Sequence, residues 1–337
     1  MGEDPMKRVL FSAPFQIQFE DVPNPVRRPG EALLQVRYVG ICGSDLHTYR
    51  GSSTLARYPV VPGHELCCEV LESEGSLSPG VTVVVEPLLA CGVCYPCRVG
   101  RYNCCEALRV LGVQTDGGMA ERISLPLKNL HPLPATADPS YGPLVETLSI
   151  GFHACKRARV GKGDRVLVIG AGPIGLGAAL VAQDKGAEVA ILDRLDARLH
   201  LAQEVGIDLA LRPEDGWQGE VLRRFDGQPS VVIEAVGSPR TLEGAIEVVS
   251  AAGRVVFVGW TSESPSWRPD LFLKKELELL GSRNSCGVFP EVIEFYCRHL
   301  AKLKRMVTHR YKMERVEEAM RLLDTAGGGA MKVILEW

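Results

Sequence analysis

The pattern of apolar and polar positions changes partway along the chain. Up to about residue 130, short segments in which apolar and polar residues alternate are separated by proline and glycine. Two examples are Leu33–Val39 and Val81–Val85. Alternation with a period of two is typical of strands that bury one face. We therefore predict a β-rich N-terminal part.

After Tyr141, apolar runs alternate with helical stretches. The pattern predicts strands at Arg165–Ile169, Val189–Leu192, Val231–Ala235 and Val255–Val258, and helices at Ile174–Lys185, Ala197–Val205 and Pro239–Ala251. This rhythm predicts an α/β fold with a parallel sheet covered by helices on both faces. It stops near Ser282. The tail then predicts helices at Pro290–Leu303 and Arg315–Asp324 and a strand at Lys332–Leu335.

Length and charge exclude several classes of protein. A chain of 337 residues is long enough for two domains with separate cores. Its net charge of −3, with 23% charged residues, argues against a nucleic-acid partner. No apolar run approaches the roughly twenty residues that span a membrane, and Met1–Pro5 lacks the apolar core of a secretory signal. We expect a cytoplasmic protein without a membrane partner.

Four cysteines lie within the glycine-rich stretch CGVCYPCRVGRYNCC. They are Cys91, Cys94, Cys97 and Cys105, with two, two and seven residues between them. Thiolates at these spacings can converge on one tetrahedral zinc ion. Disulfides are disfavoured in reducing cytosol. An iron–sulfur cluster is the more serious alternative, although bacterial ferredoxins have their fourth cysteine after three residues and before proline. We favour a structural zinc site.

A glycine motif lies in the segment RVLVIGAGPIGLGAALVAQDKGAEVAILDR. Gly170, Gly172 and Gly175, which frame Pro173 and Ile174, form the pattern G-x-G-x-x-G between a predicted strand and a predicted helix. Such a turn lets the backbone approach a pyrophosphate at the helix N-terminus. The following strand ends at Asp193, whose side chain can accept both ribose hydroxyls and would repel a 2′-phosphate. The motif predicts NAD binding, while Arg194 and Arg198 could soften the discrimination against NADP.

A second set of metal donors is dispersed along the N-terminal half. Cys42 lies in GICGSDLH, and His64 and Glu65 lie in PGHE. A catalytic zinc needs about three protein ligands and an open position for substrate. Glu146, in PLVETLSIG, is a fourth candidate. Singly, each of these residues could equally be a core side chain.

The order of these motifs resembles the zinc-dependent medium-chain dehydrogenase/reductase family along nearly the whole chain, from about Met6 to Trp337. The resemblance implies a GroES-like catalytic domain over residues 1–148, a Rossmann NAD-binding domain over 149–284, and a C-terminal segment, 285–337, that completes the first domain. It also implies two zinc ions per chain, one catalytic and one structural, and a homo-oligomer, either a dimer or a tetramer.

The combination of Gly-His-Glu with Glu146 resembles polyol and threonine dehydrogenases. By this similarity Cys42, His64 and Glu65 bind the catalytic zinc, and Glu146 is a direct ligand or acts through water. The phrases CGVCYPC, LGVQTDGG and SRNSCGVFPEVIEFY look most like the branch of L-galactonate and L-gulonate 5-dehydrogenases and starvation-sensing proteins.

The resemblance also suggests roles for residues outside the ligand set. Ser44 and His47 match a proton relay, with Ser44 as the first acceptor. Arg283 and Asn284 match substrate contacts, and Arg283 could pair with a carboxylate. Glu69 matches a carboxylate behind the zinc, with a buried salt bridge as the alternative.

The other cysteines depart from or add little to the family pattern. Cys104 stands beside Cys105 where relatives have no thiol, so the ligand could be either one, although the family spacing favours Cys105. The remaining thiols are expected to be small buried side chains: Cys67, Cys68, Cys155, Cys286 and Cys297.

The function expected from the sequence is therefore NAD-dependent oxidation of a secondary hydroxyl of a polyol or sugar acid to a ketone. The first alternative is an L-threonine 3-dehydrogenase. A second alternative is a non-catalytic nucleotide-binding sensor, since a fold alone does not imply catalysis. A zinc-ribbon module for nucleic acid is excluded by the charge.

Overall fold

The structure of the chain is a computed structural model that describes residues 5–214, 216–325 and 329–337. Residues 1–4 of Met1–Pro5, the stretch expected not to be a secretory signal, lie outside the described residues. Two compact units form. Unit 1 contains the described residues of Met1–Glu146 and Phe289–Trp337, and unit 2 contains Thr147–Val288. The first division falls within helix α3 (Leu144–Arg157) and the second at the start of α9 (Phe289–Leu303).

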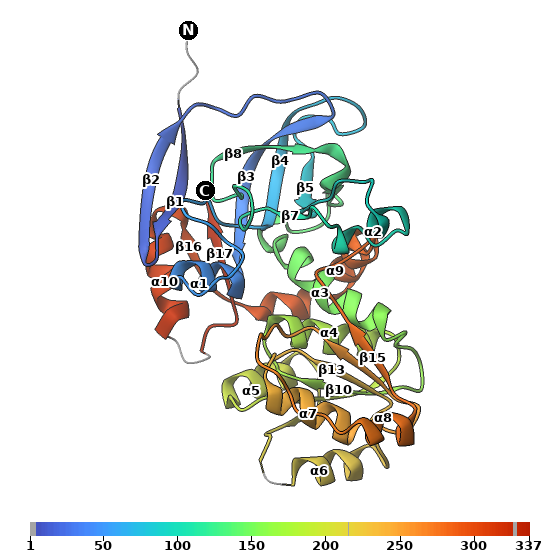
Figure 1. Cartoon of the computed structure of the whole chain (residues 1–337). Coiled ribbons are helices and arrows are strands. Elements are labelled where there is room, and N and C mark those ends of the chain that lie inside the picture. Colours follow the sequence, from blue (N-terminus) through green and yellow to red (C-terminus); the bar gives the residue numbers. More distant parts are fainter. Residues whose placement is uncertain (1–4, 215, 326–328) are drawn as a thin grey trace. The chain divides into compact units, whose positions relative to one another are not determined.

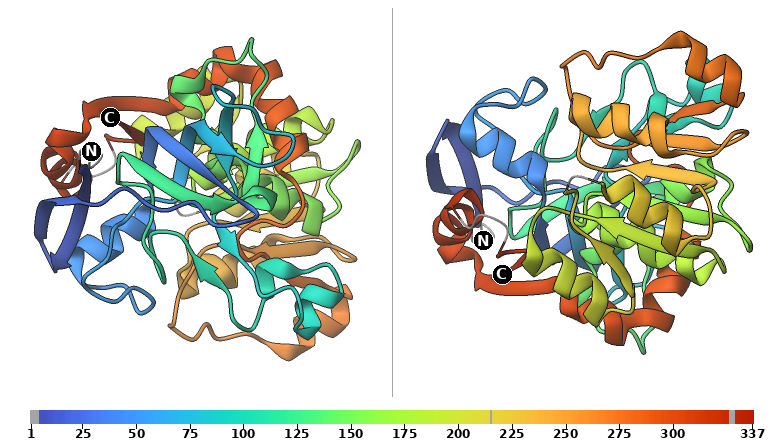
Figure 2. Two further views of the ribbon diagram at one scale, coloured as in Figure 1. Left: turned by 90° about the horizontal axis from the view of Figure 1, so that it is seen from above. Right: turned by 90° about the horizontal axis from the view of Figure 1, so that it is seen from below.

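Unit 1 is built on a seven-stranded sheet that joins both ends of the chain. Six strands lie in the order β16 (Val307–Lys312), β17 (Lys332–Glu336), β3 (Glu31–Ile41), β4 (Glu65–Ser73), β5 (Thr82–Val85) and β9 (Leu130–Pro132), and β8 (Arg122–Pro126) also pairs with β3. The C-terminal strand β17 runs antiparallel to β3, with Val333 opposite Ile41. Figure 2 shows the red C-terminal strands beside the blue strands of the N-terminal part.

Shorter elements surround this sheet. Two small sheets are the hairpin of β1 (Met6–Ala13) with β2 (Gln16–Val22), and β6 (Leu88–Leu89) with β7 (Arg109–Val110). The helices of unit 1 besides α9 are α1 (Gly43–Arg50), α2 (Tyr95–Arg98) and α10 (Val316–Thr325). Single 3₁₀ turns are η1 (Tyr102–Cys104), η2 (Leu127–Asn129), η3 (Pro139–Tyr141), η4 (Lys304–Met306) and η5 (Met313–Arg315). Apolar residues of β3, β4 and β17 pack with Met320 of α10 in one core.

Unit 2 is a six-stranded parallel sheet. The strands lie in the order β12 (Leu209–Leu211), β11 (Glu188–Leu192), β10 (Arg165–Ile169), β13 (Val231–Glu234), β14 (Arg254–Phe257) and β15 (Glu278–Gly281). Besides the part of α3 from Thr147 on, the helices are α4 (Pro173–Asp184), α5 (Asp196–Glu204), α6 (Trp217–Arg224), α7 (Pro239–Val248) and α8 (Pro269–Lys275). Figure 1 shows α4 and α7 on opposite sides of the sheet. From β10 the strand order runs outward to β12 on one side, and from β13 it runs outward to β15 on the other. Parallel sheets bind ligands at such a switch point, which here lies between β10 and β13.

The strands and helices predicted from periodicity are present, with ends that differ by at most three residues. The predicted α/β class, with a β-rich part and a parallel sheet, is confirmed. After Tyr141, the sequence reading missed α3, α6, α8, β12 and β16. All of these except α3 are short, and short elements carry little periodic signal. Within the described ranges, no helix combines the length and apolarity needed to cross a bilayer.

Candidate metal and dinucleotide sites

The four cysteines of the glycine-rich stretch come together in space. The ligand atoms of Cys91, Cys94, Cys97 and Cys105 all lie within 4.8 Å of one another. The Cys94 Sγ lies 3.4 Å from the Cys97 Sγ and 3.8 Å from the Cys105 Sγ. β6 and β7 pair antiparallel at the base of this loop and hold its two ends together. Gly92, with φ of +79°, makes a left-handed turn between the first two cysteines. Cys104 is outside the group.

The thiols of this quartet resist joint ionisation. Hydrogen bonds from the N–H groups of Val93 and Cys94 lower the pKa of Cys91 to about 6. Burial and the neighbouring Cys94 thiol raise the pKa of Cys97. Hydrogen bonds from the N–H groups of Glu106 and Cys97 lower the pKa of Cys94 as well. Further thiolates beside Cys91 and Cys94 would repel them unless a cation joins the group. Four converging sulfur donors fit zinc and leave no position for a substrate.

Cys42, His64 and Glu65 form a second group, although 21 residues separate the first from the second. Their ligand atoms all lie within 4.8 Å of one another. Cys42 follows the last residue of β3, and Glu65 is the first residue of β4. These strands pair antiparallel with Gly40 opposite Glu65, so the end of one lies beside the start of the other. His64 and Glu65 are buried, and Cys42 is partly buried.

Asp45, which the sequence analysis did not single out, forms hydrogen bonds to both chain segments of this group, the one with Cys42 and the one before His64. Its Oδ2 accepts a hydrogen bond from the Cys42 N–H at 2.8 Å, and its Oδ1 accepts one from the Gly63 N–H at 3.3 Å. Its Oδ1 also lies 3.7 Å from the His64 Nδ1, which is too long for a hydrogen bond. A carboxylate behind a histidine orients the ring toward a metal. The available signal was an acid at the third position of a helix that follows a candidate ligand.

Lys332 of β17 is a second residue that sequence reasoning missed. Its side chain is 3% exposed, and its Nζ lies 2.6 Å and 2.8 Å from the two carboxylate oxygens of Glu65. Burial disfavours its charge, but Glu65 and Cys42 outweigh burial and raise the pKa of Lys332. A lysine in a C-terminal strand carries no local sign of this partner, because the two residues meet only through sheet pairing.

Glu146 lies near this group without belonging to it. It is buried in the first turn of α3 and is not one of the side chains whose ligand atoms lie within 4.8 Å of one another. The pKa of Glu146 is raised to about 7, mainly by burial. His64 opposes this rise, and Glu65 adds to it. Both arrangements considered for Glu146, direct ligation and action through water, therefore stay proposals.

The residues of the second group fit a zinc ion. Besides burial, Glu65 raises the pKa of both Asp45 and Glu146, so these three buried acids lie close together and outnumber the one lysine, Lys332, that pairs with Glu65. The buried His64 Nδ1 accepts and donates no hydrogen bond within the described part of the chain. Burying several charges is costly without a counter-charge, which a divalent cation would supply. One sulfur, one nitrogen and one oxygen donor suit zinc.

The two residues of the suggested proton relay lie on α1, directly after Cys42. Ser44 is partly buried and His47 is exposed. The His47 Nδ1 lies 3.1 Å from the Ser52 Oγ. Residues three positions apart on a helix share a face, so Ser44 and His47 project from the same side of α1. Their relay role stays a proposal.

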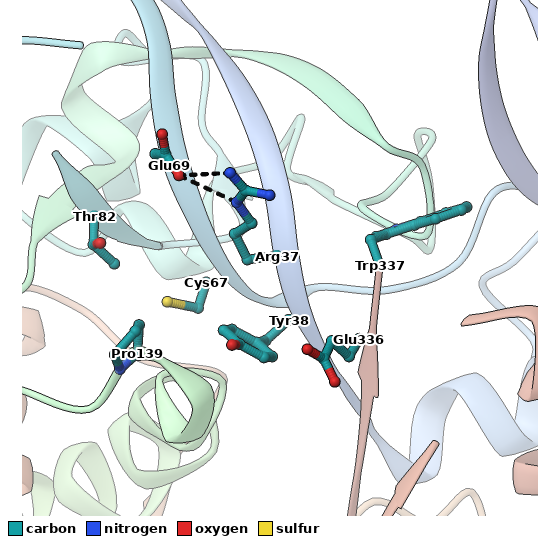
Figure 3. A pocket seen from close by; sticks show the side chains of 8 residues that line it. All are labelled: Arg37, Tyr38, Cys67, Glu69, Thr82, Pro139, Glu336 and Trp337. Carbon is teal, nitrogen blue, oxygen red and sulfur yellow. Dashed lines mark hydrogen bonds and ion pairs between the residues drawn. The ribbon is translucent and has the colours of Figure 1, made fainter. Parts of the chain in front are cut away.

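Glu69 does not lie in the metal group. Figure 3 shows its carboxylate directed at Arg37, at a pocket that Cys67 and Tyr38 also line. The Arg37 Nη2 lies 2.8 Å from the Glu69 Oε2, and the two side chains are 49% and 35% exposed. The expected salt bridge is therefore present, but it is partly exposed rather than buried. The buried carboxylate of the metal group that faces a cation is Glu65 instead.

The glycine motif forms a tight turn at the switch point of unit 2. Gly170 has φ of +101°, and Gly175 packs so closely that a Cβ would lie 1.8 Å from the Gly170 carbonyl oxygen. Gly172 is the N-cap of α4, and Pro173 and Ile174 open that helix. Backbone N–H groups at a helix N-terminus favour phosphate. This turn can therefore hold the pyrophosphate of a dinucleotide.

Asp193 lies at the end of β11 and is buried beside the glycine turn. Its Oδ2 accepts a hydrogen bond from the Ala171 N–H at 2.8 Å, and its Oδ1 accepts one from the Leu195 N–H at 2.9 Å. Arg198 lies 3.4 Å from the Oδ2, whereas Arg194 is exposed. The carboxylate is thus held by the motif that would bind the phosphates. It retains lone pairs for ribose hydroxyls.

Glu234 is a third residue missed by sequence reasoning. It ends β13 beside Ile169 and is fully buried. Its Oε1 accepts hydrogen bonds from the N–H groups of Val236 and Gly237 and from the Thr241 hydroxyl, at 2.8–2.9 Å. A Cβ at Gly170 would lie 2.8 Å from the Val236 side chain. Glu234 therefore holds the loop that packs against the dinucleotide turn.

Arg283 and Asn284 follow β15 in unit 2, where Asn284 has a left-handed φ of 45°. Their substrate contacts stay proposals.

The expectation for the other cysteines holds only in part. Cys67, Cys68 and Cys155 are buried, and burial raises the pKa of Cys67 and Cys155 to about 12. The prediction is wrong for Cys297, which is exposed, and for Cys286, which is half-buried. Cys297 lies off the face of α9 that carries its buried residues.

Known proteins share both parts of the chain. The profile of the alcohol dehydrogenase GroES-like domain matches residues 28–135, and that of the zinc-binding dehydrogenase domain matches 173–298. L-Galactonate-5-dehydrogenase of Escherichia coli K12 is 35% identical over 322 residues, 93% of this chain and 94% of that protein. Sheep sorbitol dehydrogenase is 33% identical over 323 residues, 92% of this chain and 91% of that protein.

A solved structure extends the likeness to three dimensions. The alcohol dehydrogenase RspB of E. coli CFT073, crystallised with NADH, superposes with a TM-score of 0.93 at 33% identity, covering 99% of this chain and 100% of that one. The chain therefore belongs to the zinc-type medium-chain dehydrogenase family, whose members use zinc and a nicotinamide dinucleotide.

Proposed function

We propose that this oxidoreductase uses zinc and NAD to oxidise a secondary hydroxyl of a polyol or sugar acid to a ketone. The observation that carries the proposal is the convergence of Cys42, His64 and Glu65 in one buried group. The quartet is closed by four thiolates, whereas this group offers three protein donors. The names of the relatives, a galactonate and a sorbitol dehydrogenase, support the substrate class.

In this proposal the protein holds and moves a proton. A zinc ion held by Cys42, His64 and Glu65 would supply Lewis-acid chemistry that makes the substrate hydroxyl easier to deprotonate. Ser44, two residues after Cys42 on α1, accepts this proton and releases its own hydroxyl proton toward His47. His47, exposed on the same face, passes the proton to solvent. Arg283 and Asn284 bind a substrate carboxylate or hydroxyl.

The preference for NAD over NADP rests on Asp193. Its buried carboxylate is fixed by Ala171 and Leu195, so it cannot turn away from a 2′-phosphate without breaking hydrogen bonds. Arg198 is already paired with it. Asp193→Ser should therefore raise the kcat/KM ratio of NADP⁺ to NAD⁺ by about tenfold or more, since each 1.4 kcal/mol is a factor of ten. An unchanged ratio would contradict the role of Asp193.

The experiment that tests the function is an NADH absorbance screen across polyols, hexonates and L-threonine. We expect turnover of a hexonate or polyol that Cys42→Ser abolishes. Turnover of L-threonine alone would instead identify an L-threonine 3-dehydrogenase. Tight dinucleotide binding with two zinc ions per chain but no turnover of any alcohol would favour a nucleotide sensor. Cys104→Ser is the matched control, because Cys104 lies outside both metal groups.

We also propose that the chain forms a homo-oligomer along the edge of β15. We further propose that the protein lies in the cytoplasm. β15 is the last strand of its sheet, and an unpaired strand edge is a template for a second copy. In the same unit, Trp260 and Leu273 are 74% and 85% exposed. Leu273→Glu should shift the sedimentation coefficient toward the monomer. Val26→Glu, equally exposed in unit 1, should not. All eleven cysteines are free, as expected in a reducing compartment.

A further inference from the structure

A pocket of unit 1 shares no residue with either metal group or with the dinucleotide turn. Its walls come from four neighbouring strands of the large sheet, β17, β3, β4 and β5, and from η3 (Figure 3). The volume of the pocket is about 270 Å³. A water molecule occupies about 30 Å³ in the liquid, so the pocket has room for a compound of about nine non-hydrogen atoms.

Strand pairing brings polar side chains together in this pocket. Tyr38 of β3 lies opposite Glu336 of β17 on one side and opposite Cys67 of β4 on the other. Two positions further along β4, Glu69 lies opposite Thr82 of β5. All five residues line the pocket. Because paired residues, and residues two apart on a strand, share a face, the floor of the pocket is one face of the sheet.

A β-bulge adds one more side chain to this floor. Val36 lies opposite Cys68, whereas Tyr38 lies opposite the next residue along β4, Cys67. Arg37 is therefore an extra residue in β3. Neighbouring residues of a regular strand point to opposite faces, yet Arg37 and Tyr38 both line the pocket. Bulges that redirect a side chain in this way are common beside functional sites.

The charges that line the pocket are already paired. The Arg37 Nε and Nη2 donate hydrogen bonds to the Glu69 Oε2 at 3.2 Å and 2.8 Å. The Lys312 Nζ lies 3.1 Å from the Glu336 Oε2. These two pairs carry no net charge together, so they offer an ion little attraction. A charged ligand would lose hydration without gaining an unpaired counter-charge.

The ion pairs leave hydrogen-bonding atoms unused. Both bonds from Arg37 go to one oxygen of Glu69, so the Glu69 Oε1 and the Arg37 Nη1 stay available. Among the described residues, no hydrogen-bond partner reaches the hydroxyl of Tyr38 or that of Thr82. The guanidinium nitrogen can only donate and the carboxylate oxygen can only accept, whereas a hydroxyl does both. A neutral compound with several hydroxyl groups can therefore match all four atoms.

We propose that this pocket is a second binding site, for a small neutral polyol of about four or five carbon atoms. Such compounds have about eight to ten non-hydrogen atoms, which matches the volume of the pocket. The inference goes beyond the proposed function and does not depend on it, because the pocket contains none of the residues assigned to the metal, the dinucleotide or the proton relay.

Trp337 makes the site observable, because it lines the pocket and the other three tryptophans, Trp217, Trp260 and Trp267, belong to unit 2. In protein labelled with 5-fluorotryptophan, Trp337→Phe identifies the ¹⁹F resonance of Trp337. Ribitol, a neutral five-carbon polyol, should shift this resonance in a saturable way. Cys42→Ser should keep the shift, which separates this site from ribitol bound at the proposed catalytic zinc.

Two variants test the hydrogen bonds. Tyr38→Phe and Thr82→Val each remove one hydroxyl group and should each weaken ribitol binding about fivefold, the size typical of one hydrogen bond. Thr54→Val is the matched control, because Thr54 is exposed in unit 1 outside the pocket, and it should bind ribitol like the wild type. Ribonate and 1-amino-1-deoxyribitol, which add a negative and a positive charge, should bind about tenfold more weakly than ribitol.

The absence of a saturable shift at Trp337 would overturn the proposal. So would ribitol binding that is unchanged in both Tyr38→Phe and Thr82→Val, and if Thr82→Val does not fold, Tyr38→Phe decides alone. Tighter binding of either charged analogue would refute the assignment of a neutral ligand. Failure of the proposed function would look different, because it would abolish turnover in the absorbance screen and leave the Trp337 shift in place.

Discussion

The two cysteine-containing groups of unit 1 differ in how the chain assembles them. Cys91, Cys94, Cys97 and Cys105 come from one loop whose ends are joined by β6 and β7. Cys42 directly follows β3, whereas His64 and Glu65 lie at the start of β4, and the two strands pair with each other. They are supported by Asp45 and, from the C-terminal strand, by Lys332. The first group needs only local folding, whereas the second exists only when the sheet is complete.

This difference separates stability from chemistry. A closed set of four thiolates saturates a tetrahedral metal, so its binding energy goes into folding the loop. A mixed set with buried acids behind it has charges that respond to one another. Neighbouring charges can shift the pKa values of such groups, and catalytic acids and bases need shifted pKa values. We therefore expect the two groups to fail in different ways when a ligand is removed.

The largest effect should come from Cys42→Ser. Loss of the metal would remove several kcal/mol of transition-state stabilisation, so turnover should fall on the order of a thousandfold or more. Zinc content should fall from two to one per chain, while the circular dichroism spectrum stays unchanged. Residual activity near the wild-type value would break the division of roles between the two groups.

Cys97→Ser should act on stability instead. Zinc content should again fall to one per chain, but the melting temperature should drop, because metal binding and folding of the loop are coupled. Cys104→Ser, next to a ligand but outside the quartet, should keep both zinc ions and the wild-type melting temperature. An equal loss of stability in Cys97→Ser and Cys42→Ser would remove the contrast between the groups.

Glu234→Ala tests whether dinucleotide binding is independent of both metal groups. Hydrogen bonds to a charged group contribute about 1.5–3 kcal/mol each, and Glu234 holds the loop beside Gly170 with three of them. The dissociation constant of NADH, followed by fluorescence, should rise about tenfold or more, while both zinc ions remain bound. The control is Glu247→Gln on α7, the helix that also contains Thr241. Glu247 is exposed, so this change should leave NADH binding unchanged.

The smallest effect is expected at the attachment of the cysteine loop. The Tyr102 hydroxyl donates a hydrogen bond to the buried Glu86 at 2.6 Å, and His131 lies 3.2 Å from the other carboxylate oxygen. Tyr102→Phe should lower the free energy of unfolding by about 1–3 kcal/mol, because Glu86 loses a partner while staying buried. Denaturant unfolding measures this loss. Zinc content and turnover should not change, and a lost zinc ion would show that this contact shapes the metal site itself.

The candidate ligands could be proposed from sequence because their signals are short and chemical. Cysteine spacing and a strand–glycine–helix pattern require particular residues at fixed offsets. Lys332, Asp45 and Glu234 carried no such signal. Each is an ordinary charged residue whose role comes from a partner: Lys332 meets Glu65 across 267 positions of sequence.

Errors in the opposite direction have the same origin. Glu69 was considered as a carboxylate behind the zinc, but it lies one pair of positions beyond Cys67 along β4, where it is 35% exposed and paired with Arg37. Cys297 was expected to be buried, but it lies off the buried face of α9. Residue type suggests burial or chemistry only on average, whereas the place of the residue along its strand, or its face on a helix, decides it.

The sequence by itself determined the fold class, the turn at Gly170 and the loop of four cysteines, because each depends on residues close together in the chain. Only the tertiary structure showed that Gly40, Glu65 and Lys332 lie side by side on three strands, and that Lys332 holds both oxygens of the Glu65 carboxylate. The physical reason is that strand pairing brings the C-terminal strand against β3, and burial there makes the charge of each group depend on the other.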